Sequence, residues 1–173
     1  SLILDLSRYL FPAYKKLLYS IFGFMLREHE INSKQITLSG ATYVLIAALV
    51  TVIFFPKVFV ILGIAVLIFG DIFAALIGRK FGKHKFLFKS LEGTTAFFVF
   101  GSLVMLATPK IEGSLTEYLI GFAAVGVAAI IENVSYGWAD DNLTIPLAVC
   151  GTMAVLYSIC LPNLVLVLPN VPV

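Results

Sequence analysis

The stretch Val58-Phe-Val-Ile-Leu-Gly-Ile-Ala-Val-Leu-Ile-Phe-Gly-Asp71-Ile-Phe-Ala-Ala-Leu-Ile-Gly78 carries a single charged residue, Asp71, in an otherwise apolar run. A helix needs about 20 predominantly apolar residues to cross a bilayer. Two further runs of similar length, Ile36–Phe55 and Leu143–Leu161, carry no charge at all, and each is followed by a proline. These three runs predict membrane-spanning helices.

Two shorter apolar runs, Gly93–Thr108 and Tyr118–Ile131, need flanking residues to complete a crossing. We therefore expect an all-α fold, a polytopic transmembrane helix bundle of about five to six spans, built as one integral membrane domain. The expected parts of that domain are a mixed interfacial helix or partial span at 1–35, five spans with cytoplasmic motif loops at 36–161, and a tail at 162–173.

The composition supports this fold class. Of the 173 residues, 60% are hydrophobic and 13% are charged, against about 45–50% and about 25% in soluble domains. This excludes intrinsic disorder and argues against a soluble globule. Cys150 and Cys160 are ten residues apart in one apolar run, about 15 Å along a helix, too far for a disulfide. We expect both to be buried and unpaired. A chain that begins at Ser1 is expected to lack an N-terminal piece.

The basic residues gather on one side of the membrane when the loops are assigned to alternate sides. One side receives seven, Arg27, Lys34, Arg79, Lys80, Lys83, Lys85 and Lys89, and the other receives Lys57 and Lys110. The positive-inside rule makes the first side cytoplasmic. Six acidic residues also lie there: Glu28, Glu30, Glu92, Glu132, Asp140 and Asp141. We expect any chemistry to face the cytoplasm.

Asp71 lies about 10 Å inside its span, measured from Gly78. A carboxylate at that depth is costly and is expected to face the bundle interior, a cation or a polar cavity. Asp71, Ala74, Ala75 and Gly78 share one helical face of small residues, which lets another helix or a ligand approach closely. The alternative is an aspartate that only packs helices, hydrogen-bonded to a neighbouring span.

The loop from Gly78 to Gly93 is rich in basic residues and ends in Ser90-Leu-Glu-Gly93, which opens the next span. Backbone N–H groups at a helix start bind anions, and Lys89 adds positive charge beside them. This favours a phosphate site. The alternative is a loop that only touches anionic lipid headgroups; Glu92 argues against it, since an orientation signal needs no acid. The spacing is not that of a Walker A loop.

A second set of carboxylates follows the Tyr118–Ile131 run. Glu132 shares one helical face with Gly121, Ala124 and Ala128, and Asp140-Asp141-Asn142 follows shortly after. Oxygen ligands of this kind suit a hard cation such as Mg²⁺. Helix capping by Asn142 is the open alternative at that position.

Other site classes find no support in this sequence. His29 and His84 lack metal-ligand spacing, no nucleophile elbow is present, and a nucleic-acid partner is not needed to explain a basic loop beside a bilayer. Carboxylates and bases on one membrane face together suggest a site for a metal-chelated polyphosphate. The acceptor would be a lipid, because the site opens at membrane level.

Two motifs that follow one another along the chain resemble those of a known superfamily. Gly70-Asp71-x-x-Ala74-x-x-x-Gly78-x-x-x-Gly82-Lys83 followed by Lys89-Ser90-x-Glu92-Gly93 resembles the phosphatidate cytidylyltransferases and CTP-dependent lipid kinases. Glu132 with Asp140-Asp141-Asn142-Leu-Thr-Ile-Pro146 is similar to the branch of dolichol kinase, phytol kinase and yeast-type diacylglycerol kinase. Arg27-Glu28 and Gly40-Ala41-Thr42-Tyr43 resemble that branch too, although its usual preceding membrane segment with a basic, His-containing stretch is not visible.

The resemblance implies transfer of the γ-phosphate of CTP, or another nucleoside triphosphate, to a prenol such as dolichol or phytol, or to diacylglycerol. The expected catalytic residues are Asp71, Glu92, Glu132, Asp140 and Asp141, of which Asp71, Asp140 and Asp141 are expected to hold Mg²⁺. The expected nucleotide- and phosphate-binding residues are Gly78, Arg79, Gly82, Lys83, Lys89, Ser90, Gly93 and Asn142. Glu132 is either a base or a metal ligand.

Two rival functions use the same residues. One is a cytidylyltransferase that forms a CDP-lipid, although the C-terminal signature of true members, a Gly-rich stretch ending in Asp-Arg-x-x-Asp, is absent. The other is a membrane transporter or lipid-binding protein with Asp71 as an ion site, whose binding or flux needs no nucleotide.

Overall fold

The computed structural model describes residues 39–135 and 140–168. The regular secondary structure of this part of the chain is helical apart from one short hairpin. Its elements are α4 (Gly40–Phe54), α5 (Lys57–Phe81), β1 (Lys85–Phe86), β2 (Lys89–Ser90), α6 (Leu91–Ala107), α7 (Leu115–Val134) and α8 (Asp141–Cys160). The expected interfacial or partial span at 1–35 and the end of the expected tail, 169–173, lie outside the described residues.

Each of the five apolar runs forms a helix, which confirms the all-α fold class. Within the described residues, α5, α7 and α8 are long and apolar enough to cross a membrane, while α4 and α6 are apolar but shorter. The expected count of five to six spans stays a prediction.

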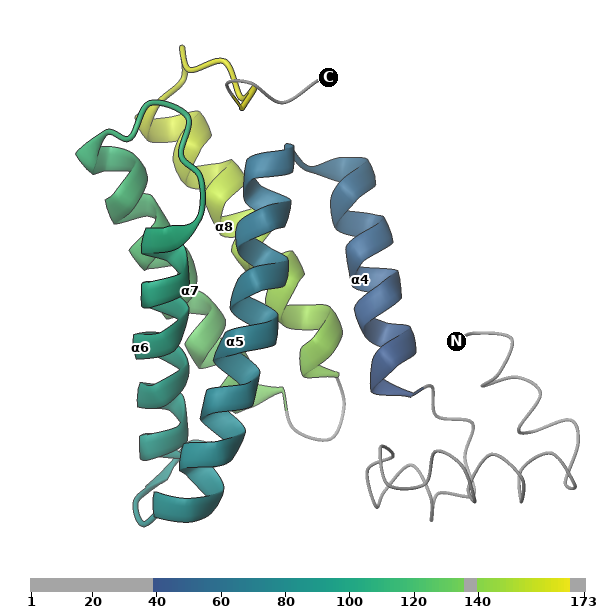
Figure 1. The fold of residues 1–173 in the computed structure, drawn as a ribbon, viewed down its shortest axis with the longest axis vertical. Helices are drawn as coiled ribbons and strands as arrows, with labels where there is room; N and C mark the ends of the chain where they lie inside the picture. Colours follow the sequence, from purple (N-terminus) through teal and green to yellow (C-terminus); the bar gives the residue numbers. More distant parts are fainter. Residues whose placement is uncertain (1–38, 136–139, 169–173) are drawn as a thin grey trace, which may run out of the picture. The chain divides into compact units, whose positions relative to one another are not determined.

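The chain divides into two compact units, 1–46 and 47–173. Of the first unit the structure describes residues 39–46, most of which form the first turns of α4. The second unit contains the bundle of α5 to α8, which run side by side in Figure 1. In that bundle α5 packs most extensively on α6, α7 packs on α8, and α5 also meets α8.

The helix ends are set by local capping. Ser90 caps the start of α6, and its hydroxyl accepts the N–H of Gly93 at 3.2 Å. Ser114 and Glu117 form a reciprocal capping box at the start of α7. Asp140 caps α8 by accepting the N–H of Asn142 at 2.9 Å. The capping residue is therefore Asp140, and Asn142, whose capping role was left open as an alternative, supplies the N–H that Asp140 accepts.

The face of small residues on α5 packs against α6. A Cβ atom added to Gly93 would lie 3.3 Å from the Cα of Gly78 and 3.2 Å from the carbonyl oxygen of Ala74. Ala74 is buried, so the backbones of the two helices meet here with almost nothing between them. This close approach positions the start of α6, and with it the preceding hairpin, against the end of α5.

The matching face on α7 also faces the core. Gly121, Ala124, Ala128 and Glu132 are all buried, as the spacing predicts. Gly121 receives the side chain of Met105 from α6 so closely that an added Cβ would lie 2.7 Å from its sulfur. The face thus leads from packed residues in the middle of the bundle to a buried carboxylate at one end.

The two cysteines differ in their environment. Both are unpaired, as expected from their separation, and Cys150 is buried. Cys160 is exposed, so the expectation that both are buried was wrong. Cys160 is the last residue of α8, where the helix leaves the packed part of the bundle.

The positively charged segment 79–92 is not an irregular loop but contains regular secondary structure. Helix α5 continues to Phe81, and the next residues form an antiparallel hairpin that pairs Lys85 with Ser90 and Phe86 with Lys89. Figure 1 shows this hairpin region at the same end of the bundle as the end of α7 and the start of α8. The predicted site residues of these segments therefore come from one end of the bundle.

Candidate functional site

Lys89 connects three segments that are far apart in the sequence. Its Nζ atom lies 2.6 Å from Oε1 of Glu132, at the end of α7, and 3.4 Å from Oδ2 of Asp141, at the start of α8. The exposed fractions of the side chains are 28% for Lys89, 4% for Glu132 and 10% for Asp141. The structure thus brings a lysine and two carboxylates of the predicted set into one largely buried cluster.

Asp71 contributes a third carboxylate from α5. It lies close enough to Glu132 for the two side chains to interact electrostatically, and Asp141 interacts with Glu132 in the same way. The Oε2 atom of Glu132 is buried and has no hydrogen-bond partner among the residues that the structure describes. Buried carboxylate oxygens are normally paired, so this oxygen is available to a ligand, a proton or a cation. We refer to Asp71, Lys89, Glu132 and Asp141 as the carboxylate cluster.

Asn133 holds the hairpin in place and was missed from the sequence. Its Oδ1 atom accepts the backbone N–H groups of Phe88 at 2.9 Å and Lys89 at 3.2 Å. Its amide nitrogen donates to Oγ1 of Thr94 in α6 at 2.6 Å. Asn133 is fully buried. An uncharged polar side chain at the end of an apolar run, directly after Glu132, was the available signal.

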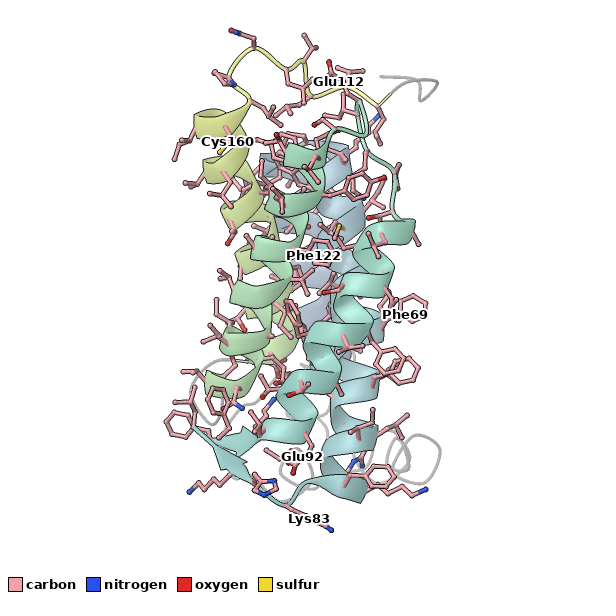
Figure 2. The ribbon with its side chains drawn as sticks, turned by 90° about the vertical axis from the view of Figure 1, so that its left-hand side faces the viewer. Phe69, Lys83, Glu92, Glu112, Phe122 and Cys160 are labelled. Atoms are coloured by element: carbon pink, nitrogen blue, oxygen red, sulfur yellow. The ribbon has the colours of Figure 1, made fainter. Side chains whose placement is uncertain are left out.

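Glu92 is engaged with the base of the hairpin. Both of its carboxylate oxygens accept the backbone N–H of His84, at 3.2 and 3.3 Å, and Oε1 lies 2.7 Å from Nδ1 of the His84 ring. Figure 2 shows Glu92 and Lys83 at the end of the bundle opposite Glu112 and Cys160. In this structure Glu92 therefore fixes the turn between α5 and β1, and His84 is the partner that sequence reasoning did not find.

The predicted phosphate-binding bases do not all gather at the carboxylate cluster. Arg79 and Lys83 are exposed, and the Nε atom of Arg79 donates to the carbonyl oxygen of Ala75 in its own helix at 3.0 Å. Of the predicted phosphate-binding bases, Lys89 belongs to the cluster, through its contacts with Glu132 and Asp141. The exposed bases surround the same end of the bundle and raise its positive potential.

Three predicted phosphate-binding glycines make close backbone contacts. Gly78 and Gly93 face each other between α5 and α6. A Cβ atom on Gly82 would collide with the carbonyl oxygen of Gly78 and would lie 2.9 Å from the Cβ atom of Ser90. Since the hydroxyl of Ser90 accepts the N–H of Gly93, these residues build the joint between the two helices and the hairpin.

The two aspartates at the start of α8 share one donor. The N–H of Asn142 lies 2.9 Å from Oδ1 of Asp140 and 3.1 Å from Oδ1 of Asp141. The other oxygen of Asp141 is the one near Lys89. Asp141 therefore links the cap of α8 to the carboxylate cluster, and Asp140 lies on the turn beside it.

The donors in the carboxylate cluster suit a hard cation in their chemistry. Carboxylate oxygens are the groups that Mg²⁺ prefers, and the unpartnered Oε2 of Glu132 is one such oxygen. Within residues 39–135 and 140–168, no group of three His, Cys, Asp or Glu side chains is already arranged to hold a metal ion. In this geometry the ammonium of Lys89 lies between Glu132 and Asp141 and balances their charge.

A similar protein of known sequence covers most of the chain. An uncharacterized protein of Rickettsia prowazekii is 31% identical over 151 residues, which are 87% of this chain and 74% of that protein. The chain belongs to the same family as the Rickettsia protein. No protein-family profile matches the chain, and no solved structure matches it.

Two named kinases are also similar. The phytol kinase of a Synechocystis species is 32% identical over 102 residues, 52% of this chain and 41% of that kinase, so the match spans less than half of the kinase. The CTP-dependent diacylglycerol kinase 1 of Schizosaccharomyces pombe is 26% identical over 159 residues, 82% of this chain and 69% of that kinase. Together they support the CTP-dependent lipid kinase family for this chain, without selecting a branch.

Proposed function

We propose that this chain is a membrane lipid-alcohol kinase, which transfers the γ-phosphate of CTP to a prenol or to diacylglycerol. The observation that carries the proposal is the carboxylate cluster, in which Lys89 meets Glu132 and Asp141 at one end of an apolar helix bundle. The similarity to a phytol kinase and to a CTP-dependent diacylglycerol kinase supports it.

Phosphoryl transfer to an alcohol requires a proton acceptor for the hydroxyl and positive charge at the phosphates. The hydroxyl oxygen of the lipid forms a bond to the γ-phosphorus, the bond from that phosphorus to the bridging oxygen of the β-phosphate breaks, and CDP leaves. The hydroxyl proton passes to a carboxylate. Positive charge must stabilise the phosphates while the two reactants are held in line. Glu132, with one free and buried oxygen, is our candidate for the proton acceptor.

The remaining residues are assigned by position. Lys89 would turn from the carboxylates to the phosphates when the nucleotide binds, and Arg79 and Lys83 would hold the outer part of the triphosphate. Asp71, Asp140 and Asp141 would hold Mg²⁺, which supplies charge neutralisation of the phosphates when it is bound. Glu92, Ser90 and the glycines at 78, 82 and 93 would keep the hairpin and the start of α6 in register.

The membrane gives the site its acceptor. Helices α5, α7 and α8 are long and apolar enough to cross a bilayer. The carboxylate cluster lies at the end of α7 and the start of α8, with Asp71 further inside α5. A lipid hydroxyl at the headgroup level could therefore reach the cluster without leaving the membrane. The excess of lysine and arginine in the neighbouring loops supports a cytoplasmic position for this end of the bundle, where CTP is available.

The proposal is tested with two labelled nucleotides. The purified protein in mixed lipid is given CTP labelled at the γ-phosphate or at the α-phosphate, with Mg²⁺ and with prenols, diacylglycerol or phosphatidic acid as acceptors. We expect γ-label in a lipid alcohol. Transfer of α-label to phosphatidic acid would instead identify a CDP-lipid synthase. Transfer of neither label, together with no protection by CTP against thermal unfolding, would favour a transporter or lipid-binding protein.

Two variants link the activity to the cluster. Asp71→Asn and Lys89→Ala should each lower lipid phosphorylation about 10²–10³-fold, the size of effect seen when one group that stabilises the transition state electrostatically is removed. Glu112→Gln is the matched control, because Glu112 lies in the exposed loop at the opposite end of the bundle. Full activity of either cluster variant would reject this assignment of the site.

A further inference from the structure

The hairpin presents an apolar tip to its surroundings. With Lys85 paired to Ser90 and Phe86 to Lys89, the turn consists of Leu87 and Phe88. The exposed fractions are 37% for Phe86, 52% for Leu87 and 59% for Phe88. Three consecutive large apolar side chains at a turn are unusual, because turns favour glycine, asparagine and aspartate.

The backbone of this turn is held in an unfavourable conformation. Leu87 has a φ of 51°, a left-handed conformation that is a genuine outlier for a bulky side chain. The following two N–H groups, of Phe88 and Lys89, are both fixed by the buried Oδ1 of Asn133. The fold therefore keeps a leucine at a position that suits glycine, and anchors the turn so that the apolar side chains stay exposed. Strain of this kind points to a use for the side chain.

Positive charge surrounds the apolar tip. Lys80 and Lys83 lie just before the hairpin and Lys85 lies in β1, and all three are exposed. The hairpin directly follows α5, a helix long enough to cross a bilayer, and precedes the apolar α6. Apolar side chains bordered by lysines complement an anionic lipid leaflet, in which acyl chains lie just below negatively charged headgroups.

We propose that the tip formed by Phe86, Leu87 and Phe88 inserts into the boundary between headgroups and acyl chains of an anionic leaflet, while Lys80 and Lys85 bind the headgroups. This proposal does not depend on the proposed reaction, because it rests only on the exposed apolar residues of the hairpin and the lysines beside them. It would also fix the depth of Lys89, which follows the tip directly, relative to the lipid surface.

The depth of the tip can be measured by fluorescence. The chain has one tryptophan, Trp138, so Phe88→Trp in a Trp138→Phe background reports on the hairpin alone. The substitution keeps an aromatic ring and leaves the backbone bond to Asn133 in place. The full chain is reconstituted in phosphatidylcholine vesicles with and without phosphatidylglycerol, and with lipids brominated along the acyl chains. We expect blue-shifted emission that brominated lipid quenches, more strongly with phosphatidylglycerol.

Three further variants complete the test. Leu103→Trp, on an exposed part of α6, is the control for full quenching by acyl chains, and Leu87→Trp is a second probe of the tip. Lys80→Gln with Lys85→Gln should weaken the effect of phosphatidylglycerol. Emission like that of tryptophan in water would overturn the proposal. Blue-shifted emission that brominated lipid does not quench would also overturn it, since the tip would then be covered by protein.

Discussion

The Nζ atom of Lys89 lies 2.6 Å from Oε1 of Glu132, a residue 43 positions further along the chain. The side chain of Glu132 is 4% exposed, whereas that of Lys89 is 28% exposed. Burial of an ionised carboxylate is costly unless a positive charge accompanies it. Lys89 thus provides the positive charge that allows Glu132 to lie inside the bundle. The stability of Glu132 in this position depends more on Lys89 than that of Lys89 depends on Glu132, because Lys89 is partly exposed to solvent.

This inequality predicts an asymmetric double-mutant cycle. Lys89→Met should lower the free energy of unfolding by about 3 kcal/mol, the low end for breaking a buried pair, since it leaves Glu132 unpaired. Glu132→Gln should cost less than about 1 kcal/mol, because Lys89 keeps Asp141 and partial contact with solvent. The double variant should be more stable than Lys89→Met alone. Thermal unfolding in detergent, calibrated with denaturant, measures all four proteins, and strictly additive effects would contradict this interpretation.

Asn133 should control the order of the hairpin. Asn133→Leu removes the acceptor of the Phe88 and Lys89 N–H groups, so we expect a loss of about 1–3 kcal/mol in stability, the usual cost of leaving a hydrogen-bonding group without its partner. Amide hydrogen exchange at residues 85–90 should become much faster. Thr94→Val is the matched control: it removes the partner of the Asn133 amide nitrogen, and the bond from the Thr94 hydroxyl to the carbonyl oxygen of Ser90, but leaves Oδ1 of Asn133 in place. Unchanged exchange in Asn133→Leu would show that the hairpin is held by other contacts.

The sequence predicts the helices well because each depends on a local property. The five apolar runs mark the helices, and the spacing of Gly121, Ala124 and Ala128 identifies the face of α7 that is buried. Lys89, Glu132 and Asp141 were each singled out from their own segments. Their contact was only a general expectation, because it depends on how α7, α8 and the hairpin pack.

The parts that could not be predicted depend on long-range packing or on exceptions to local rules. Asn133 meets the hairpin across 45 and 44 residues, and no local pattern shows that it does. The hairpin itself places Leu87 at a positive φ, where turn statistics expect glycine. Cys160 was expected to be buried because it lies near the end of an apolar run. It is exposed because it is the last residue of α8, where the helix no longer packs against its neighbours.

Helix α7 carries a buried glutamate at each end, which gives a matched pair of variants. Glu117 accepts the backbone N–H groups of residues 111–114 and the hydroxyl of Tyr157, at 2.6 to 3.2 Å. Glu117→Gln replaces one accepting oxygen by a donor, so we expect a loss of about 2–3 kcal/mol in stability. Lipid phosphorylation per folded molecule should stay unchanged, because the carboxylate cluster lies at the other end.

Glu132→Gln should behave in the opposite way. Its stability should change little, while lipid phosphorylation falls about 10²–10⁴-fold, the usual contribution of a general base. Turnover is measured per folded molecule, with the folded fraction taken from size-exclusion chromatography in detergent. If both glutamines lowered turnover equally, Glu132 would have no role beyond that of a structural carboxylate.

The contact between α5 and α6 predicts a steric effect at one glycine and none at another. In Gly93→Ala, the new methyl group would lie 3.0 Å from Oγ of Ser90, 3.2 Å from the carbonyl oxygen of Ala74 and 3.3 Å from Cα of Gly78. Two of these atoms belong to helix backbone that cannot easily move, so we expect a loss of about 1–3 kcal/mol in stability, typical of overpacking. Lys89 should also shift relative to Glu132, because Gly93 and the hairpin are joined through Ser90.

Gly151→Ala is the matched control, since Gly151 is also inside a helix and an added Cβ meets no atom within 4 Å. It should stabilise the protein by up to about 1 kcal/mol, the difference in helix propensity between alanine and glycine. Thermal unfolding of the two variants, with lipid phosphorylation measured in parallel, separates the effects. Equal stability of the two would mean that α5 and α6 are further apart at Gly78 and Gly93 than the structure places them. The contact between these helices would then not explain the position of the hairpin and of Lys89.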